Sequence, residues 1–450
     1  MLVEETADDS ERRARSGRAA DARSPPSGGT RVRVRLSHPV CCARQSTDVP
    51  RRQAVRDARE FGFHTRAAQS HLDGKKVDRP LSVPIVQSTT HQVASSREMG
   101  TLFRNRADII YTRFGNPTNT AAEEKIAALE GAEAGLIFGS GMGAIVTALL
   151  TVLKGGDHVV AQRDIFAQTF TFLDRVARPL GVETTFVDAT RPDEVRGALR
   201  PNTKLIYIES PSNPLLKIVD IAAIADLARP RGLPLFIDST FASPYLQNPI
   251  SLGATLVLHS ATKFLGGHSD IQCGAAAGPR DLVRRIYEMR AVLGTIQDPH
   301  NAWLLLRGMK TLGVRVQRQC ETALRLAQFL QGQPGVRAVH YPWLETSPYH
   351  ALARRQMRAA GGVLSFDVQG GLPAARAFLD ALELIPIATS LGGVETLIEI
   401  PAELDFNEDE MGAEVAKTGL TPALIRLSVG LEDVDDLLGD LKRGLAALSP

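Results

Sequence analysis

Between residues 135 and 259, short apolar segments alternate with longer segments whose apolar residues recur at helical spacing. The short segments read GLIF, HVVA, ETTFV, KLIYIE, PLFID and TLVLH. Strands that alternate with helices in this way form crossover units and build a mostly parallel sheet. Because most of these segments are continuously apolar, both faces of the sheet must be covered. The sequence therefore predicts an α/β fold whose large domain spans residues 121–310.

The pattern changes after this region. A long helical segment, broken around GTIQDPHN, is followed by the apolar segment GGVLSFDV. A short helical segment, the strand LIRLSV and a final amphipathic segment complete the chain. This mixture predicts a smaller α+β domain over residues 311–450. Residues 61–120 are polar and irregular, with LSVPIVQSTTH as the main extended piece, and are expected to form an arm.

Residues 1–60 have a composition that does not support a folded core. They contain 13 Arg, no Lys, nine acidic residues and no aromatic residue, and they include SPPSGG. Such a segment buries too little apolar surface to offset the entropy lost on ordering. We expect a disordered, Arg-rich tail, and its nine acidic residues argue against a transit peptide.

Charge and cysteine usage exclude several classes of protein. The net charge of +2 gives no case for nucleic-acid binding by the whole chain. No apolar run approaches the roughly 20 residues that span a membrane, and the charged start does not resemble a secretory signal. The cysteines at 41, 42, 273 and 320 form no CxxC pair. We therefore expect a cytoplasmic protein without a membrane or nucleic-acid partner.

Three groups of residues follow the carboxyl ends of predicted strands, where parallel sheets bind their ligands. Lys263 follows TLVLH within five residues, together with Ser260 and Thr262, among small and apolar neighbours. Lysine is seldom buried unless it is paired or used chemically. Asp238 closes PLFID, and the loop GSGMGAI (139–145) follows GLIF and begins a helix. The free N–H groups of such a loop suit a phosphate.

These groups together predict a site for pyridoxal 5'-phosphate, which requires a phosphate cradle, a strand-end acid and a lysine that forms a Schiff base. Lys263 would bind the aldehyde, and desolvation would lower the pKa of its amine and favour the reactive neutral form. Asp238 would keep the ring nitrogen protonated, so that the ring withdraws electrons from the substrate.

Other interpretations of the same residues stay open. The glycine loop loosely matches a dinucleotide fingerprint, which leaves a nicotinamide-dependent dehydrogenase as an alternative of another class. The acid expected about 20 residues on is poorly matched, however, because Asp157 precedes its strand. A catalytically silent binding protein is a further alternative. His259, His268 and Asp270 lack a third ligand at suitable spacing, so no metal site is expected.

Seven motifs resemble the Cys/Met metabolism family of pyridoxal-phosphate enzymes, which includes cystathionine γ-synthases, cystathionine lyases, methionine γ-lyases and O-acylhomoserine sulfhydrylases. The motifs are YTRFGNPT, GSGMGAI, ESPSNPLLKIVDI, FIDSTFASPYLQNP, HSATKFLGGHSD, TSLGGVETLI and IRLSVGLED. The resemblance covers about residues 62–447. It implies a fold-type-I, aspartate-aminotransferase-like architecture and a homotetramer, a dimer of dimers with shared active sites, in which the arm 61–120 contacts the neighbouring subunit.

The resemblance also implies roles for individual residues. Lys263 is similar to the Schiff-base lysine, and Asp238 to the partner of the ring nitrogen. Tyr111 and Arg113 resemble a pair that reaches the cofactor phosphate in the neighbouring subunit. The resemblance also implies a catalytic role for Tyr111. The other residues that match cofactor ligands are Gly141, Met142, Phe166, Asn213, Ser260 and Thr262. The residues that match substrate ligands are Arg426, Ser390, Asn213 and Thr389.

Three positions differ from the usual pattern of the family. Phe166 stands where most members have a tyrosine stacked on the cofactor, so stacking is kept and the hydroxyl is lost. Gln168 occupies the place of a cysteine typical of methionine γ-lyases. Thr389 replaces a glutamate that would hold the distal amino group of cystathionine.

The activity that the resemblance implies is γ-replacement or γ-elimination on a sulfur amino acid or O-acylhomoserine in transsulfuration. SLGGVETL and GGHSD favour an enzyme similar to cystathionine γ-synthase or γ-lyase. O-succinylhomoserine sulfhydrylase and methionine γ-lyase are the alternatives within the family.

We predict that removal of residues 1–60 leaves catalysis and assembly unchanged, because this segment lacks the apolar residues that a packed interface needs. Specific activity and elution volume in gel filtration should match those of the full chain. A loss of activity or a change of oligomer size would show that the tail has a structural role.

Overall fold

The computed structural model describes residues 60–69, 80–105, 110–405 and 419–448. The predicted tail lies outside the described residues, apart from Glu60. The described residues after position 54 belong to one compact unit. Two sheets organise this unit, one of seven strands and one of four. Among the described residues, no helix combines the length and apolar character needed to cross a membrane.

The large sheet is mostly parallel, which confirms the predicted fold class. Its strand order is β1-β7-β6-β5-β4-β2-β3, and β7 alone runs against its neighbours. The strands are β1 (Ala134–Phe138), β2 (His158–Gln162), β3 (Glu183–Val187), β4 (Thr203–Glu209), β5 (Leu235–Asp238), β6 (Leu256–Ser260) and β7 (Gly274–Gly278). The first six coincide closely with the apolar segments of the sequence.

Strand β7 was not predicted, because its sequence GAAAG lacks the β-branched and aromatic residues typical of strands. Packing explains its composition. Ser140 is the N-cap residue of helix α4 (Gly141–Val152). A side chain on Gly274 would overlap the main-chain oxygen of Ser140. The small residues of β7 therefore let the first turn of α4 lie directly against the sheet.

Helices cover both faces of the large sheet. One face packs against α4 and α9 (Arg280–Leu293), and the other against α3 (Pro117–Glu130) and α7 (Ile221–Ala228). Side chains alternate between the two faces along a strand. The residues that pack on the α4 face near the ends of three strands are Tyr207, Phe236 and Leu258. The residues two positions further on, which face the same side, are Glu209, Asp238 and Ser260.

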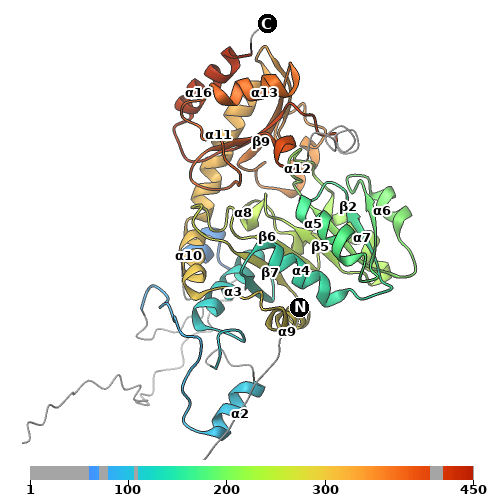
Figure 1. Ribbon diagram of the computed structural model, residues 1–450, viewed down its shortest axis with the longest axis vertical. Coiled ribbons are helices and arrows are strands. Elements are labelled where there is room, and N and C mark those ends of the chain that lie inside the picture. Colours follow the sequence, from blue (N-terminus) through green and yellow to red (C-terminus); the bar gives the residue numbers. More distant parts are fainter. Residues whose placement is uncertain (1–59, 70–79, 106–109, 406–418, 449–450) are drawn as a thin grey trace, which may run out of the picture. The chain divides into compact units, whose positions relative to one another are not determined.

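The second sheet is antiparallel, with the order β10-β11-β9-β8. Its strands are β8 (Val336–His340), β9 (Val363–Val368), β10 (Leu397–Glu399) and β11 (Leu424–Ser428). The helices that form a common core with it are α11 (Leu312–Gln331), α13 (Gly371–Asp380) and α16 (Val434–Ala446). Figure 1 shows α11 extending from beside α10 (Pro299–Lys310) to this sheet. Strand β11 was predicted and β9 lies within the apolar segment GGVLSFDV, whereas β8 and the three-residue β10 were not predicted.

The remaining described α-helices are mostly short. They are α1 (Phe63–Ala68), α2 (Ser96–Arg104), α5 (Ala167–Thr171), α6 (Pro192–Ala198), α8 (Ser243–Leu246), α12 (His350–Gln356) and α14 (Pro401–Asp405). Helix α5 continues as a π-helical turn over Phe172–Ala177. Helix α2 buries no residue, and Figure 1 shows it apart from the helices that cover the large sheet.

Candidate active site

A cavity of about 460 Å³ lies at the carboxyl ends of β4, β5 and β6, on the face that carries α4. Both sheets contribute to its lining. The residues singled out in the sequence that line it are Gly141, Met142, Phe166, Gln168, Asn213, Asp238, Ser260, Thr262, Lys263, Thr389, Ser390 and Arg426. Segments more than 280 residues apart in the sequence therefore meet in one cavity.

Lys263 lies just after β6 and reaches across the cavity toward the loop that precedes β10. Its Nζ donates a hydrogen bond of 2.8 Å to Oγ of Ser390. Burial, and to a smaller extent the nearby positive charge of Arg426, lower the pKa of Lys263 to about 8, while Glu399 acts in the opposite sense. A substantial fraction of the amine is therefore neutral, and hence nucleophilic, near physiological pH.

The loop that carries Lys263 is held by close packing. Phe264 is buried, and a side chain on Gly392 would come within 2.7 Å of its main-chain nitrogen. Gly392 has φ +75°, a conformation that glycine adopts without strain. On another side, Nη2 of Arg315 donates a 3.0 Å hydrogen bond to the carbonyl of Phe264. These contacts fix where the lysine leaves the main chain.

The first turn of α4 has a geometry that suits the predicted anion cradle. Oγ of Ser140 accepts the N–H of Gly143 at 2.9 Å, and the N–H groups of Gly141 and Met142 have no acceptor within the helix. A side chain on Gly141 would come within 2.8 Å of Cβ of Ser260. Only a residue without Cβ allows the helix and the Ser260 hydroxyl to approach so closely, as a phosphate between them requires.

Thr262 lines the same part of the cavity, but its hydroxyl already has partners. Oγ1 accepts the N–H of Cys273 at 3.0 Å and donates to the Cys273 carbonyl at 3.2 Å. Rotation of the hydroxyl proton alone would redirect the donated bond toward a phosphate and keep the accepted one.

Asp238 ends β5 and is buried beside the cavity. Its Oδ1 accepts two hydrogen bonds from Thr240, at 2.9 Å from the amide and 2.5 Å from the hydroxyl. Burial raises the pKa of Asp238, and the hydrogen bonds from Thr240 oppose that effect. A buried carboxylate is stabilised by a cation, and a protonated ring nitrogen provides one. The amine, the cradle and this acid together fit the cofactor predicted from the sequence.

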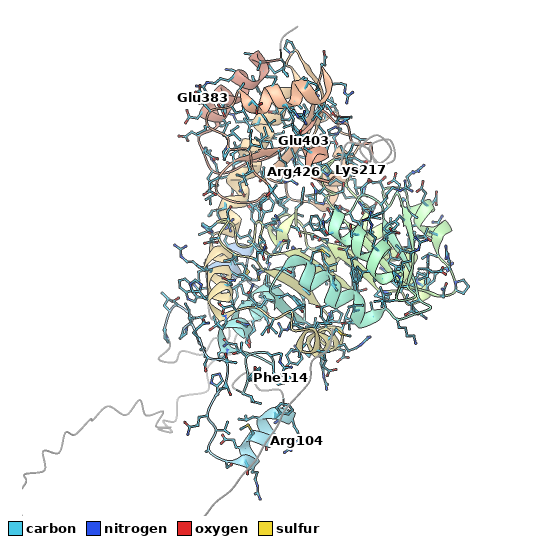
Figure 2. The ribbon with its side chains drawn as sticks, in the orientation of Figure 1. Arg104, Phe114, Lys217, Glu383, Glu403 and Arg426 are labelled. Carbon is cyan, nitrogen blue, oxygen red and sulfur yellow. The ribbon has the colours of Figure 1, made fainter. Side chains whose placement is uncertain are left out.

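Arg426 lies in the middle of β11, on the side of the four-stranded sheet that faces the large sheet (Figure 2). Its Nη1 donates to Oδ1 of Asn213 at 3.0 Å, and its Nη2 donates to the Ser390 carbonyl at 2.9 Å. Nη2 also forms a 2.7 Å ion pair with Glu399, its cross-strand neighbour on β10. Ser390, which has the unusual φ of +88°, thus contacts both the amine of Lys263 and the guanidinium.

Tyr111 and Arg113 do not line this cavity. They line a separate cavity of about 420 Å³ together with residues near the start of α10. The guanidinium of Arg113 lies 4.9 Å from the ring centre of Phe114 and donates to the Ala291 carbonyl at 3.2 Å. Figure 2 shows Phe114 far from Arg426. The role of these two residues toward a neighbouring subunit stays a prediction.

His259 and His268, the histidines considered for a metal site, have protein partners. His259 lies on the opposite face of β6 from Ser260, and its Nε2 pairs with buried Glu130 at 2.6 Å. Nδ1 of His268 lies 2.8 Å from the Gly266 carbonyl. Within the described ranges, no three His, Cys, Asp or Glu side chains gather as metal ligands would.

Several residues that line the cavity were missed from the sequence: Glu209, Thr240, Gln272 and Glu399. Glu209 closes the strand KLIYIE as Asp238 closes PLFID, and this shared position is a signal that would have found it. Glu399 offered no such signal, because it reaches Arg426 only through the pairing of the short strand β10.

Comparison with known proteins now identifies the family. The sequence profile described as "Cys/Met metabolism PLP-dependent enzyme" matches residues 64–446. The chain belongs to this family. The chain is therefore a pyridoxal-phosphate-dependent enzyme, and its membership does not support the dehydrogenase alternative.

Individual relatives align over nearly their whole lengths. An L-methionine γ-lyase of Fusobacterium nucleatum subsp. polymorphum is 41% identical, over 86% of this chain and 99% of that protein. A cystathionine γ-lyase of Bacillus subtilis is also 41% identical, over 83% and 96% of the two chains. The crystal structure of metB from Corynebacterium glutamicum has a TM-score of 0.81 and 40% identity, and the match covers 87% of this chain and 100% of that one.

The pKa of Lys263 leads to a prediction about cofactor uptake. Because only the neutral amine attacks an aldehyde, the rate at which cofactor-free protein recombines with pyridoxal phosphate should rise with pH through about pH 8 and then level off. Absorbance after rapid mixing measures this rate. In an Arg426→Gln variant the midpoint should move to higher pH, since the positive charge that lowers the pKa is gone. A wild-type rate that still rises steeply above pH 10 would contradict the desolvated amine.

Proposed function

We propose that this chain catalyses elimination or replacement at the γ-carbon of a sulfur amino acid. The observation that carries the proposal is the double contact of Ser390 with Lys263 and Arg426. An α-amino acid must have its carboxylate bound while a base reaches its α-carbon. Ser390 sets the amine and the guanidinium at adjacent places in one cavity and so suits them to these two tasks.

The cofactor would be held by the α4 N-terminus, Ser260 and Asp238, with the Phe166 ring beside it. When bound, pyridoxal phosphate supplies a ring that withdraws electrons and stabilises negative charge on the substrate carbons. Arg426 binds the substrate carboxylate, and Asn213 holds the guanidinium in position. Nζ of Lys263 accepts the proton from the α-carbon and returns it elsewhere on the substrate, while Ser390 orients the amine.

The same site supports both outcomes. Once the γ-substituent has left, entry of a thiol at Cγ gives replacement, and hydrolysis without a thiol gives a 2-oxo acid and ammonia. The relatives from Fusobacterium nucleatum and Bacillus subtilis are both named as γ-lyases, which supports chemistry at this carbon.

The proposal extends to the assembly. We infer a homotetramer in which Tyr111 and Arg113 of one subunit complete the cavity of its neighbour. Their place in a separate cavity, away from Lys263 of the same chain, supports this inference. Cys273 and Cys320 are free and buried, which fits the reducing conditions of the cytoplasm.

The lining of the cavity favours substrates whose γ-substituent is uncharged. In its described part, three carboxylates line the cavity, and each has partners. Asp238 binds Thr240, Glu209 binds main-chain N–H groups, and Glu399 pairs with Arg426. The neighbouring side chains Thr389, Gln168 and Leu404 are neutral. A distal ammonium, as in cystathionine, would therefore lack a countercharge that is not already engaged.

A product assay tests the reaction class. The enzyme loaded with pyridoxal phosphate is incubated with methionine, homocysteine, cystathionine or O-acylhomoserine, with and without added thiol. We expect 2-oxobutanoate and ammonia without thiol, or a thioether when thiol is present. Pyruvate as the sole oxo acid would indicate β-elimination, and no product with any substrate would refute the proposal.

A substitution at Thr389 tests whether this residue determines how well the distal ammonium group of cystathionine is bound. Thr389→Glu should raise kcat/KM for cystathionine relative to methionine on the order of tenfold, because a carboxylate would pair with the distal ammonium. Thr389→Gln, which has the same length without the charge, serves as the control and should give no such gain. If wild type already prefers cystathionine strongly and neither variant changes the ratio of the two kcat/KM values, another residue binds the distal ammonium.

A further inference from the structure

Glu209 connects two loops that border the cavity from different directions. It ends β4 and is 5% exposed. Its Oε2 accepts the N–H of Phe166 at 2.8 Å, at the end of the loop that follows β2. Its Oε1 accepts the N–H of Asn213 at 3.1 Å, in the loop that follows β4 itself. Both carboxylate oxygens are thus used by main-chain donors of residues that line the cavity.

We propose that Glu209 is a positioning residue that aligns the cofactor-stacking side chain Phe166 with the carboxylate clamp formed by Asn213 and Arg426. The proposal rests on the function proposed above for this cavity. No direct contact of Glu209 with substrate or cofactor is required, because it acts through the two loops that it joins.

The contacts form a continuous series. The side chain of Phe166 is 41% exposed, so packing alone does little to fix its place, and the bond to Glu209 fixes its main chain. The side-chain oxygen of Asn213 accepts the hydrogen bond from Arg426. The main-chain N–H of Asn213 donates to Glu209. A shift of the Glu209 carboxylate would therefore move both the ring beside the cofactor and the arginine that binds the substrate.

The chemistry of the carboxylate suits this task. Only an ionised Asp or Glu offers two acceptor oxygens without a donor, so a glutamine here would set its amide N–H group against one of the main-chain N–H groups.

The surroundings of Glu209 also argue against a role in stability alone. Glu209 lies directly beside Asp238 in the β4–β5 register. Burial and that negative charge raise the pKa of Glu209 well above its ordinary value, while the two N–H groups, from Phe166 and Asn213, oppose the rise and favour the ionised form. A fold that needed only stability would gain more from a neutral residue here.

The chain contains a matched control. Asp440 is 0% exposed, and its carboxylate accepts three main-chain N–H groups, from Glu383, Leu384 and Ile385. It resembles Glu209 in burial and in its main-chain donors, and it differs in that its Oδ1 also accepts a 3.2 Å hydrogen bond from Nη1 of Arg443. It does not line the cavity, however, so Asp440→Asn removes a carboxylate of the same kind without touching the site.

The experiment compares Glu209→Gln, Glu209→Asp and Asp440→Asn with wild type. The dissociation constant of pyridoxal phosphate is measured by fluorescence titration of the cofactor-free protein. Steady-state kinetics with methionine give KM and kcat, and thermal unfolding without cofactor gives Tm. For Glu209→Gln we expect the dissociation constant and KM each to rise about tenfold or more, since a charge-assisted hydrogen bond is lost on each side. Glu209→Asp, which keeps both oxygens, should recover part of each loss.

The control decides between alignment and plain stability. Asp440→Asn should lower Tm and leave the dissociation constant and KM within about twofold of wild type. If Glu209→Gln behaves in the same way, Glu209 is only structural and the proposal is wrong. If Glu209→Gln does not fold, Glu209→Asp must show both increases, and unchanged values overturn the proposal. A wild type that binds the cofactor but converts no sulfur amino acid would instead contradict the proposed function. The dissociation constants of pyridoxal phosphate would still test the positioning role of Glu209.

Discussion

The hydrogen bond between Nζ of Lys263 and Oγ of Ser390 joins the two sheets at the point where the chemistry takes place. Lys263 follows a strand of the large sheet, and Ser390 precedes the short strand β10 of the four-stranded sheet. Burial of the amine costs free energy, and that cost lowers its pKa to about 8. The same cost makes the lysine reactive, because the neutral amine is the form that attacks carbonyl groups and accepts protons.

The electrostatics of the cavity follow from where its charges stand. Arg426 is balanced by Glu399. The neighbouring carboxylates Asp238 and Glu209 instead accept hydrogen bonds from neutral groups, namely the amide and hydroxyl of Thr240 and two main-chain N–H groups. The region around β4 and β5 is thus negative and suits a cationic ring nitrogen, while the region around β11 is prepared for a carboxylate. A zwitterionic amino acid and a protonated cofactor ring match this division of charge.

Much of this arrangement was predictable from the sequence, for a specific physical reason. Parallel strands bring their carboxyl ends to one edge, so Asp238, Lys263 and the loop before α4 had to lie close together. The failures also have physical causes. The strand GAAAG has no β-forming residues, and the place of Glu399 depends on a three-residue strand that no periodicity reveals. The engagement of the Thr262 hydroxyl by Cys273 depends on how the connection between β6 and the unpredicted strand β7 folds back on itself.

The most direct test of the account is the Lys263→Ala variant, examined by visible absorbance, turnover and thermal unfolding. The account predicts that the absorption band of the lysine-bound cofactor and all measurable turnover are lost. The cofactor-free variant should unfold at the wild-type temperature or above, because a buried amine has been removed. A variant that folds and retains turnover within tenfold of wild type would contradict the assignment of Lys263 and the site built around it.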